Sequence, residues 1–194
     1  MSMVKNTLAK TPLIIKVVSL YIVMISTGWI LHQYATPAKP AAITYQVIET
    51  KQPAEMITGQ PTQITIKRLG VDVAVLDGDY NTADDSWTLS DTAAHFATIT
   101  TLPNNKQGNT FIYGHNTDAV LAPVKDLVTG DLLTVRTTNG YVFNYTYSGD
   151  VTVSPDQTSV LSAYSATPQI TLMTCQGINN ETRRIMHFDF IGMS

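Results

Sequence analysis

The sequence predicts an all-β domain, a closed β-barrel with short helices, preceded by one N-terminal transmembrane helix. Three observations lead to this prediction. After residue 60, many short apolar or alternating runs follow one another at close spacing, with turn residues between them. That part of the chain is rich in Thr, Asn, Asp, Val and Ile, a composition typical of strands and turns. A single long apolar run stands near the N-terminus.

The apolar run covers residues 13–31, which are 19 residues with Lys16 as their only charge. A membrane-spanning helix needs about 20 such residues, and Lys16 is close enough to the end for its long stem to reach the headgroups. Lys5 and Lys10 precede the run, and no acidic residue does. The positive-inside rule therefore predicts a cytoplasmic N-terminus and an extracytoplasmic remainder.

This interpretation divides the chain into four parts. They are a cytoplasmic N-terminus at 1–12, a transmembrane signal anchor at 13–32, an extracytoplasmic linker at 33–56 and a barrel at 57–194. A cleaved signal peptide is the alternative, but the run is long for the apolar part of such a peptide and a poor cleavage site follows it. The sequence thus favours a single-pass protein of the plasma membrane.

Within the barrel, strands are indicated by alternation and by turn residues. The expected strands are 63–67, 71–76, 110–114, 132–136, 141–147, 169–174 and 184–191. Thr-Asn-Gly at 138–140 predicts a hairpin turn. Ser90 and Asp91 are expected to cap a short helix that runs through Phe96, and residues 119–127 to form one or two helical turns.

Charge and cysteine content narrow the class of function. The formal net charge is −3, so no basic excess points to nucleic-acid binding. Cys175 is the only cysteine and can form no internal disulfide, and a spare thiol in an exported domain is exposed to oxidants. The alternative role for a lone cysteine is that of a small buried apolar residue. The scattered histidines have no metal-ligand spacing, so no metal site is predicted.

Reactive side chains concentrate at strand ends. Cys175 and His115 each directly follow an expected strand, and Arg183 and Arg184 stand where the last strand begins. A barrel can bring such ends together in one groove and hold them rigidly. There, a histidine can serve as the base for a thiol and protonate a leaving amine, while an arginine donates hydrogen bonds to an oxyanion. Three further histidines compete for the role: His32, His95 and His187.

Four segments resemble the sortase family in their order and spacing. Thr-Leu-Met-Thr-Cys at 171–175 matches the TLxTC signature of sortases, and residues 109–116 resemble the segment that carries their catalytic histidine. Residues 127–133 are similar to the sortase L-x-x-G-D segment, and 184–186 to the closing strand with the catalytic arginine. The resemblance covers about residues 60–191 and is specific, because four segments occur in one order behind an anchor.

The resemblance implies an eight-stranded barrel and a transpeptidase. Cys175 would be the nucleophile, His115 the general acid and base, and an arginine the oxyanion stabiliser. In sortases the cysteine attacks the Thr–Gly bond of a C-terminal LPxTG-type motif, and an amine from a cell-wall precursor or a pilin lysine resolves the thioacyl enzyme. The implied partners are sorting-signal peptides of surface proteins or pilins, that amine, and the lipid bilayer. No organic cofactor is implied, and no acidic cluster is clear enough to predict calcium.

The catalytic arginine must be chosen between two neighbours. Arg183 and Arg184 face opposite sides of a strand. If Arg184 faces the groove, then Met186, Phe188 and Phe190 share its face, and most polar groups of the strand remain in water. We therefore choose Arg184, and Arg183 is then a solvated or paired surface cation.

Other residues shape the predicted groove. Thr174 is assigned to the substrate site, where it helps to position the backbone of the nucleophile. Residues 149–168 are expected to form a groove wall, because long loops on rigid barrels carry specificity. Gln176 and Gly177 stand where many sortases have a proline nearby, which leaves the preferred motif open. A cysteine peptidase that only hydrolyses, and a catalytically inactive anchored binding module, are the alternative functions.

Overall fold

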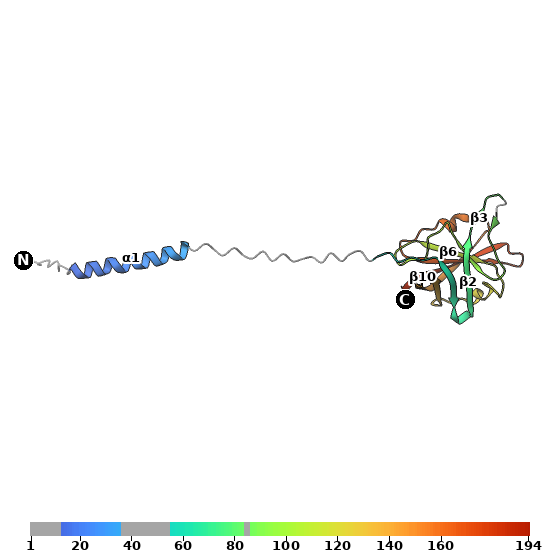
Figure 1. The fold of residues 1–194 in the computed structure, drawn as a ribbon, viewed down its shortest axis with the longest axis horizontal. Coiled ribbons are helices and arrows are strands. Elements are labelled where there is room, and N and C mark those ends of the chain that lie inside the picture. Colours follow the sequence, from blue (N-terminus) through green and yellow to red (C-terminus); the bar gives the residue numbers. More distant parts are fainter. Residues whose placement is uncertain (1–12, 36–54, 84–85) are drawn as a thin grey trace, which may run out of the picture. The chain divides into compact units, whose positions relative to one another are not determined.

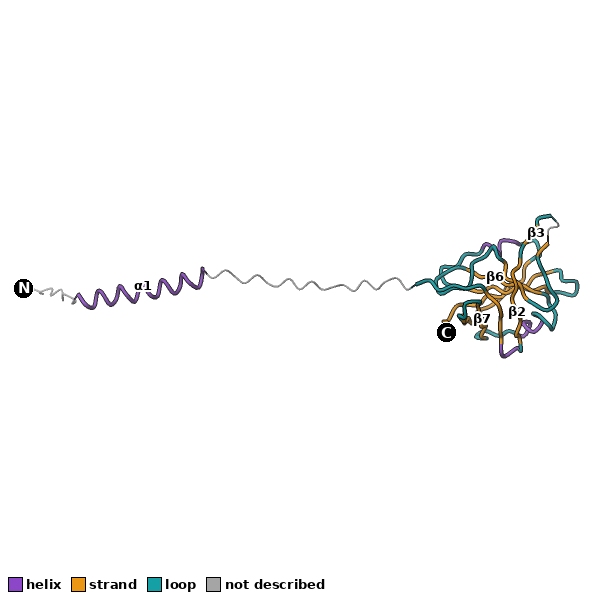
Figure 2. Tube along the Cα trace, viewed as in Figure 1, coloured by secondary structure: helices purple, strands orange, loops and turns teal. Residues whose placement is uncertain are grey.

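The computed structural model describes residues 13–35, 55–83 and 86–194 (Figures 1 and 2). The chain divides into two compact units, Met1–Lys51 and Gln52–Ser194. The described part of the first unit is helix α1 (Leu13–Ala35), which covers the residues that were predicted to be helical. Among the described residues, no helix is both long enough and apolar enough to cross a membrane. The membrane anchor therefore stays a prediction from the sequence.

The second unit contains a closed eight-stranded β-barrel, which confirms the barrel part of the predicted fold class. Its strands close in the order β1-β2-β5-β6-β9-β10-β8-β7. Their bounds are β1 (Pro61–Ile66), β2 (Val71–Gly78), β5 (Ala94–Ala97), β6 (Asn109–Gly114), β7 (Leu132–Thr137), β8 (Val142–Val153), β9 (Gln169–Gln176) and β10 (Thr182–Met193). The β2–β5 and β6–β9 pairs are parallel, and the other pairs of the barrel are antiparallel.

Short elements decorate the barrel. A separate two-stranded hairpin consists of β3 (Tyr80–Asn81) and β4 (Ser86–Trp87). The described residues also form three 3-10 helices, η1 (Lys67–Leu69) before the hairpin, and η2 (Ala122–Asp126) and η3 (Thr158–Ser162) after it. Helix η2 lies within the predicted helical turns at 119–127. The predicted hairpin turn at 138–140 joins β7 to β8, and Gly140 there has a φ of 86°, which glycine adopts without strain.

Alternation along the strands fills the barrel with apolar side chains. The interior cluster includes Ile64, Ile112, Leu172, Met186 and Phe188, which are at most marginally exposed. A second, smaller cluster lies on the opposite face of β6 and β10, and its members are Ala97, Phe111, Tyr113 and Ile185, with Trp87, Val160, Leu161 and Met173 packed against them. Strand β6 is therefore buried at every position, which explains its apolar run.

The helix predicted after Ser90 is wrong. The Ser90 hydroxyl does accept a hydrogen bond from the Ala93 N–H at 3.0 Å, as a helix cap would. The chain then enters β5, however, which runs parallel to β2 and antiparallel to β6 and is buried at every position. Pairing with a strand on each side outweighs the helical preference of the alanines at both ends of β5.

Candidate active site

Cys175 and His115 follow equivalent positions of two neighbouring parallel strands. In the β6–β9 pair, Gly114 is the register partner of Thr174. His115 is the residue after Gly114, and Cys175 is the residue after Thr174 and is partly exposed. The two strands therefore deliver the imidazole and the thiol to the same end of the barrel, as the sequence predicts for adjacent strand ends.

The antiparallel pairing of β9 with β10 decides which arginine accompanies Cys175. Arg183 is the direct partner of Cys175, and Arg184 is the direct partner of Thr174. Side chains directly opposite one another in a sheet lie on the same face. Arg183 thus shares the face of Cys175, and the expectation that Arg184 does so is not met.

The residues of β10 are divided between its two faces as expected, but Cys175 lies on the face opposite to the expected one. Arg184 does alternate with Met186 and Phe188, as expected, and those two side chains fill the barrel interior. Cys175 is on the other face, where its partner strand presents Ile185 and the outer cluster. The grouping of residues into two faces was predicted correctly, and the face that carries the thiol was not.

The loop between β9 and β10 holds Arg183 in place. The Nη1 group of Arg183 donates hydrogen bonds to the carbonyl oxygens of Asn180 at 2.8 Å and Thr182 at 3.1 Å. Asn180 has a φ of 57°, in the left-handed region that asparagine tolerates better than most residues. Glu181 accepts a hydrogen bond from the Asn179 N–H at 2.9 Å. The guanidinium of Arg183 is thus tied to its own loop by backbone carbonyls, which neutralise none of its charge.

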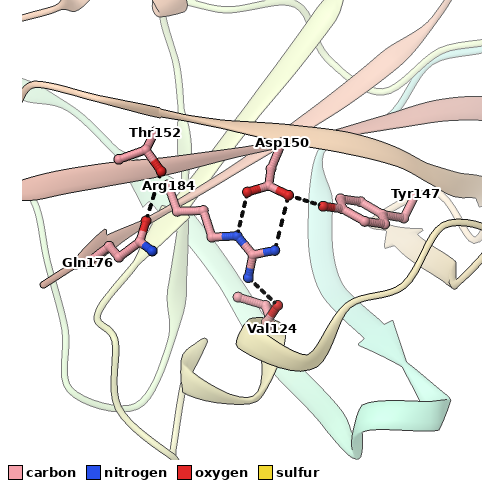
Figure 3. Close-up of polar contacts among 6 residues, drawn as sticks. All are labelled: Val124, Tyr147, Asp150, Thr152, Gln176 and Arg184. Atoms are coloured by element: carbon pink, nitrogen blue, oxygen red, sulfur yellow. Dashed lines mark hydrogen bonds and ion pairs between the residues drawn. The ribbon is translucent and has the colours of Figure 1, made fainter.

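Arg184 is engaged in a polar cluster on the interior face, which Figure 3 shows. Its Nε and Nη2 groups donate to the two carboxylate oxygens of Asp150 at 2.8 and 3.1 Å, and Nη1 donates to the Val124 carbonyl at 2.8 Å. The hydroxyl of Tyr147 also donates to Asp150. The side chains of Arg184 and Asp150 are 14% and 29% exposed, so this fork is partly shielded from solvent.

These contacts shift three pKa values. The hydrogen bond from Arg184 holds the pKa of Asp150 below its usual range, with a smaller contribution from Tyr147. The same bond raises the pKa of Arg184. Burial, and then the hydrogen bond to Asp150, raise the pKa of Tyr147. The cluster therefore stays an ion pair with a neutral phenol near neutral pH.

His115 lies at the edge of the site. Its side chain is 37% exposed, and its Nε2 atom is 4.0 Å from an oxygen of the fully solvated Asp91 carboxylate. Such a long and exposed contact contributes little to the stability of the fold. The backbone of His115 is fixed more firmly, because its carbonyl oxygen accepts a hydrogen bond from the Leu121 N–H at 3.1 Å.

Thr174 is buried, and its hydroxyl donates to the Gly114 carbonyl at 2.9 Å. It therefore faces the barrel interior and joins the strand that carries Cys175 to the strand that ends at His115. This contact fits the prediction that Thr174 helps to position the backbone of Cys175. Direct contact with a substrate on the face of Cys175 does not fit it.

A cavity of about 440 Å³ lies on the face that carries Cys175 and Arg183. Arg183 and Met173 line it, and Met173 is two residues before the thiol on the same face of β9. Aromatic and apolar side chains form much of its other walls, namely Tyr80, Trp87, Phe111, Tyr113, Val153, Pro155, Val160 and Leu161. The segment that follows β8 adds polar residues, namely Ser154, Asp156, Gln157 and Thr158. The end of β8 and the following loop thus form a wall, as predicted for residues 149–168.

The remaining histidines lie elsewhere. His95 is buried in β5, where its ring stacks on Tyr113, and His187 lies in β10 with its Nδ1 atom 3.5 Å from the Thr171 hydroxyl. His32 lies in α1. Within residues 13–35, 55–83 and 86–194, no three acidic, histidine or cysteine side chains are close enough to hold a metal ion.

The sequence favours Arg184 over Arg183 without excluding Arg183, and it gives no indication of Asp150 as a partner of either arginine. The register between β9 and β10 depends on how many residues the Gly177–Glu181 loop takes up, which the strand patterns do not reveal. Asp150 lies in the half of β8 that was expected to be a loop. The one signal that could have found it is an acidic residue, Asp150, on a strand that pairs with the strand of the two arginines.

Comparisons with known proteins agree on one family. The family described as Sortase domain matches residues 64–188. Sortase E1 from Streptomyces coelicolor, solved with a tripeptide in the active site, is 21% identical, with a TM-score of 0.57 over 70% of this chain and 90% of that one. Sortase A from Listeria monocytogenes is 20% identical, with a TM-score of 0.56 over 71% of this chain and 90% of that one.

A third solved structure gives the same result. Sortase C from Clostridium perfringens SM101 is 16% identical, with a TM-score of 0.56 over 70% of this chain and 72% of that one. No curated protein matches the chain by sequence. At these identities the solved structures establish the fold, and the match over residues 64–188 establishes the family.

Proposed function

The chain belongs to the sortase family of cysteine transpeptidases, and from this premise we propose that Cys175, His115 and Arg183 perform the reaction. Sortases act on sorting-signal peptides of surface proteins or pilins. For this chain we propose a C-terminal LPxTG-like motif as the substrate and its Thr–Gly bond as the bond that breaks.

The proposed first half-reaction acylates Cys175. His115 takes the thiol proton of Cys175, and the Sγ atom attacks the threonine carbonyl carbon. The oxyanion of the tetrahedral intermediate accepts hydrogen bonds from Arg183. The C–N bond to glycine then breaks, and His115 donates a proton to the leaving amine. The products are a thioacyl enzyme and a free amino-terminal glycine peptide.

The second half-reaction transfers the acyl group to an amine. The incoming nitrogen attacks the thioester carbonyl while His115 accepts its proton, and Arg183 again stabilises the oxyanion. The C–S bond breaks, an amide forms, and His115 gives the proton to the sulfur of Cys175, which restores the thiol. An amine from a cell-wall precursor or a pilin lysine is the proposed acceptor.

One observation carries the assignment of roles, the direct opposition of Cys175 and Arg183 across the β9–β10 pair. A planar guanidinium beside the nucleophile can donate two hydrogen bonds to an oxyanion. Arg184 was the arginine predicted from the sequence, but three of its N–H groups are already bound to Asp150 and Val124. Its location on the interior face therefore favours Arg183 for catalysis.

The cavity beside Arg183 supports the proposed substrate class. Its aromatic and aliphatic side chains suit the apolar residue of the motif, the polar residues at 154 and 156–158 can bind polar groups of a peptide, and Arg183 also lines it. We propose that the peptide lies along the outer face of β6 and β9, between the hairpin and η3, with its threonine carbonyl next to Cys175.

We also propose that residues 13–32 anchor the enzyme in the plasma membrane with the barrel outside the cell. The support is the apolar run of 19 residues at 13–31 and the two preceding lysines. Cell fractionation tests this proposal. The full chain is expected in the membrane fraction, with the barrel accessible to added protease in intact cells, and recovery in the soluble fraction would contradict it.

Product analysis tests the enzyme function. Incubation with an LPxTG-type peptide and triglycine is expected to give a peptide whose threonine carboxyl is joined to triglycine. If the peptide is cleaved but triglycine never enters a product, the enzyme is a cysteine peptidase that only hydrolyses. If a panel of such peptides binds without being cleaved, the chain is an inactive binding module.

A further inference from the structure

Arg184 occupies a position whose contacts reach beyond its own strand. Three of the five N–H groups of a guanidinium are committed, two to Asp150 and one to the Val124 carbonyl. Asp150 belongs to β8 and Val124 to η2, so one side chain joins three elements (Figure 3). A bidentate arginine–carboxylate pair has a fixed geometry, which makes the guanidinium a rigid donor for the third bond.

The Val124 carbonyl lies in the segment that follows His115. Within this segment, the Val124 N–H donates to the Leu121 carbonyl at 3.1 Å, and the Leu121 N–H donates to the His115 carbonyl at 3.1 Å. Leu121 and Val124 are also buried in the interior cluster. A short run of backbone hydrogen bonds therefore leads from the guanidinium of Arg184 to the backbone of His115.

Thr174 performs the matching task on the other side of His115. Its hydroxyl holds the Gly114 carbonyl, directly before His115, and its register partner across β9–β10 is Arg184. Cys175 and Arg183 thus face outward as a pair. Their chain neighbours Thr174 and Arg184 face inward and donate hydrogen bonds to the Gly114 and Val124 carbonyls, which lie before and after His115 in the chain.

We propose that Arg184 is a positioning residue that holds His115 in register with Cys175 by clamping the Val124 carbonyl of η2. The inference rests on the proposed function, since it assigns a task to a neighbour of the same site. Arg184 does not touch the substrate. It acts through His115, and Asp150 acts by orienting Arg184.

Kinetics of Arg184→Met give the first test. Loss of the clamp is expected to lower kcat by about 10- to 100-fold, the cost of a misplaced catalytic group, while KM for the peptide stays unchanged, because no substrate contact is lost. Arg184→Lys is expected to restore part of kcat, since one ammonium cannot reproduce both the fork and the third bond. Arg136→Met removes an exposed arginine of β7 and serves as the matched control, with wild-type kcat expected.

A double-mutant cycle on the pH dependence of thiol alkylation separates positioning from general destabilisation. Cys175 is the only cysteine, so iodoacetamide reports on it alone. Arg184→Met is expected to shift the pH profile of alkylation when His115 is present and to change nothing further in a His115→Ala background. An equal shift in both backgrounds would overturn the proposal, because Arg184 would then act independently of His115.

The outcomes also separate this inference from the proposed function. If Cys175→Ala retains turnover, the catalytic assignment itself fails. If Cys175→Ala is inactive and Arg184→Met keeps the wild-type kcat and alkylation profile, only the clamp fails. Should Arg184→Met not fold, Arg184→Lys decides the question, since wild-type kcat in that variant overturns the clamp and a lower kcat at unchanged KM supports it.

Discussion

At the scale of single residues, the two adjacent arginines have opposite surroundings, which suit the different tasks that we propose for them. Arg183 is bound only to backbone carbonyls, whereas Arg184 is bound to a carboxylate. A guanidinium that is held but not neutralised can respond to a developing negative charge. One that is already paired with a carboxylate is better suited to hold structure.

The first prediction concerns Arg183→Lys. Loss of an oxyanion donor costs about 10²- to 10³-fold in kcat, and a lysine cannot present the two-pronged donor of arginine. We expect a loss of that size with an LPxTG-type peptide in a steady-state assay. Arg136→Lys, on an exposed part of β7, should retain wild-type kcat. Wild-type kcat in Arg183→Lys would contradict the role assigned to Arg183.

The second prediction concerns the pH dependence of stability. Because Arg184 lowers the pKa of Asp150 in the folded state, the ion pair stabilises the fold above the unfolded pKa of aspartate, about 3.9. That contribution is lost as the pH falls through the lower folded pKa. Urea unfolding of the wild type and Asp150→Asn should therefore differ most near pH 7 and progressively less below pH 4. A difference that does not depend on pH would exclude this source of stability.

At the scale of elements, the strand patterns predicted most of the barrel, and the register between strands was out of their reach. Alternation located β1, β2 and β7 because each has one face in the core. It misjudged β5, whose four residues are all buried and so show no alternation. The length of β8 was also missed, since its second half is largely exposed and polar.

The same holds for the candidate site, where the strand ends could be predicted and the register between strands could not. Cys175 and His115 could be proposed from the sequence because each follows an expected strand. The choice between Arg183 and Arg184 required the pairing of β9 with β10, which the intervening loop and the neighbouring strands set together. Periodicity shows which residues of one strand share a face. It does not show which residues of the neighbouring strand lie on that same face, because this depends on the register.

The third prediction tests the link between β6 and β9. Thr174→Val keeps the shape of the side chain and removes the buried hydrogen bond to the Gly114 carbonyl. Leaving a buried acceptor without its donor costs about 1–3 kcal/mol, which denaturant unfolding can measure. Thr62→Val is the matched control, because its hydroxyl bonds to the Arg136 carbonyl at an exposed position where water can replace it. The control should stay within about 0.5 kcal/mol of the wild type.

At the scale of the whole molecule, the barrel contains everything that the proposed chemistry requires. The interior cluster runs from Ile57 to Met193, and the nucleophile, the histidine and both arginines lie within these bounds. The unit Gln52–Ser194 is compact in its own right. A closed barrel also leaves no unpaired edge among its eight strands, which protects an isolated domain from edge-to-edge association.

The fourth prediction follows from this organisation. A chain reduced to residues 52–194 should fold, since domains with their own core fold alone, and should cleave a soluble peptide with the kcat/KM of the full chain. Circular dichroism and a steady-state assay on the two proteins provide the comparison. An unfolded or inactive fragment would show that the preceding residues contribute to the fold or to the site.

Trapping the acylated enzyme tests directly whether Cys175 is the nucleophile. Intact-mass spectrometry after mixing with an LPxTG-type peptide, with no amine added, is expected to show an adduct with the mass of the peptide up to threonine. Peptide mapping should locate it on Cys175, and it should disappear when triglycine is added. Cleavage of the peptide by Cys175→Ala, or an adduct on any other residue, would contradict the account.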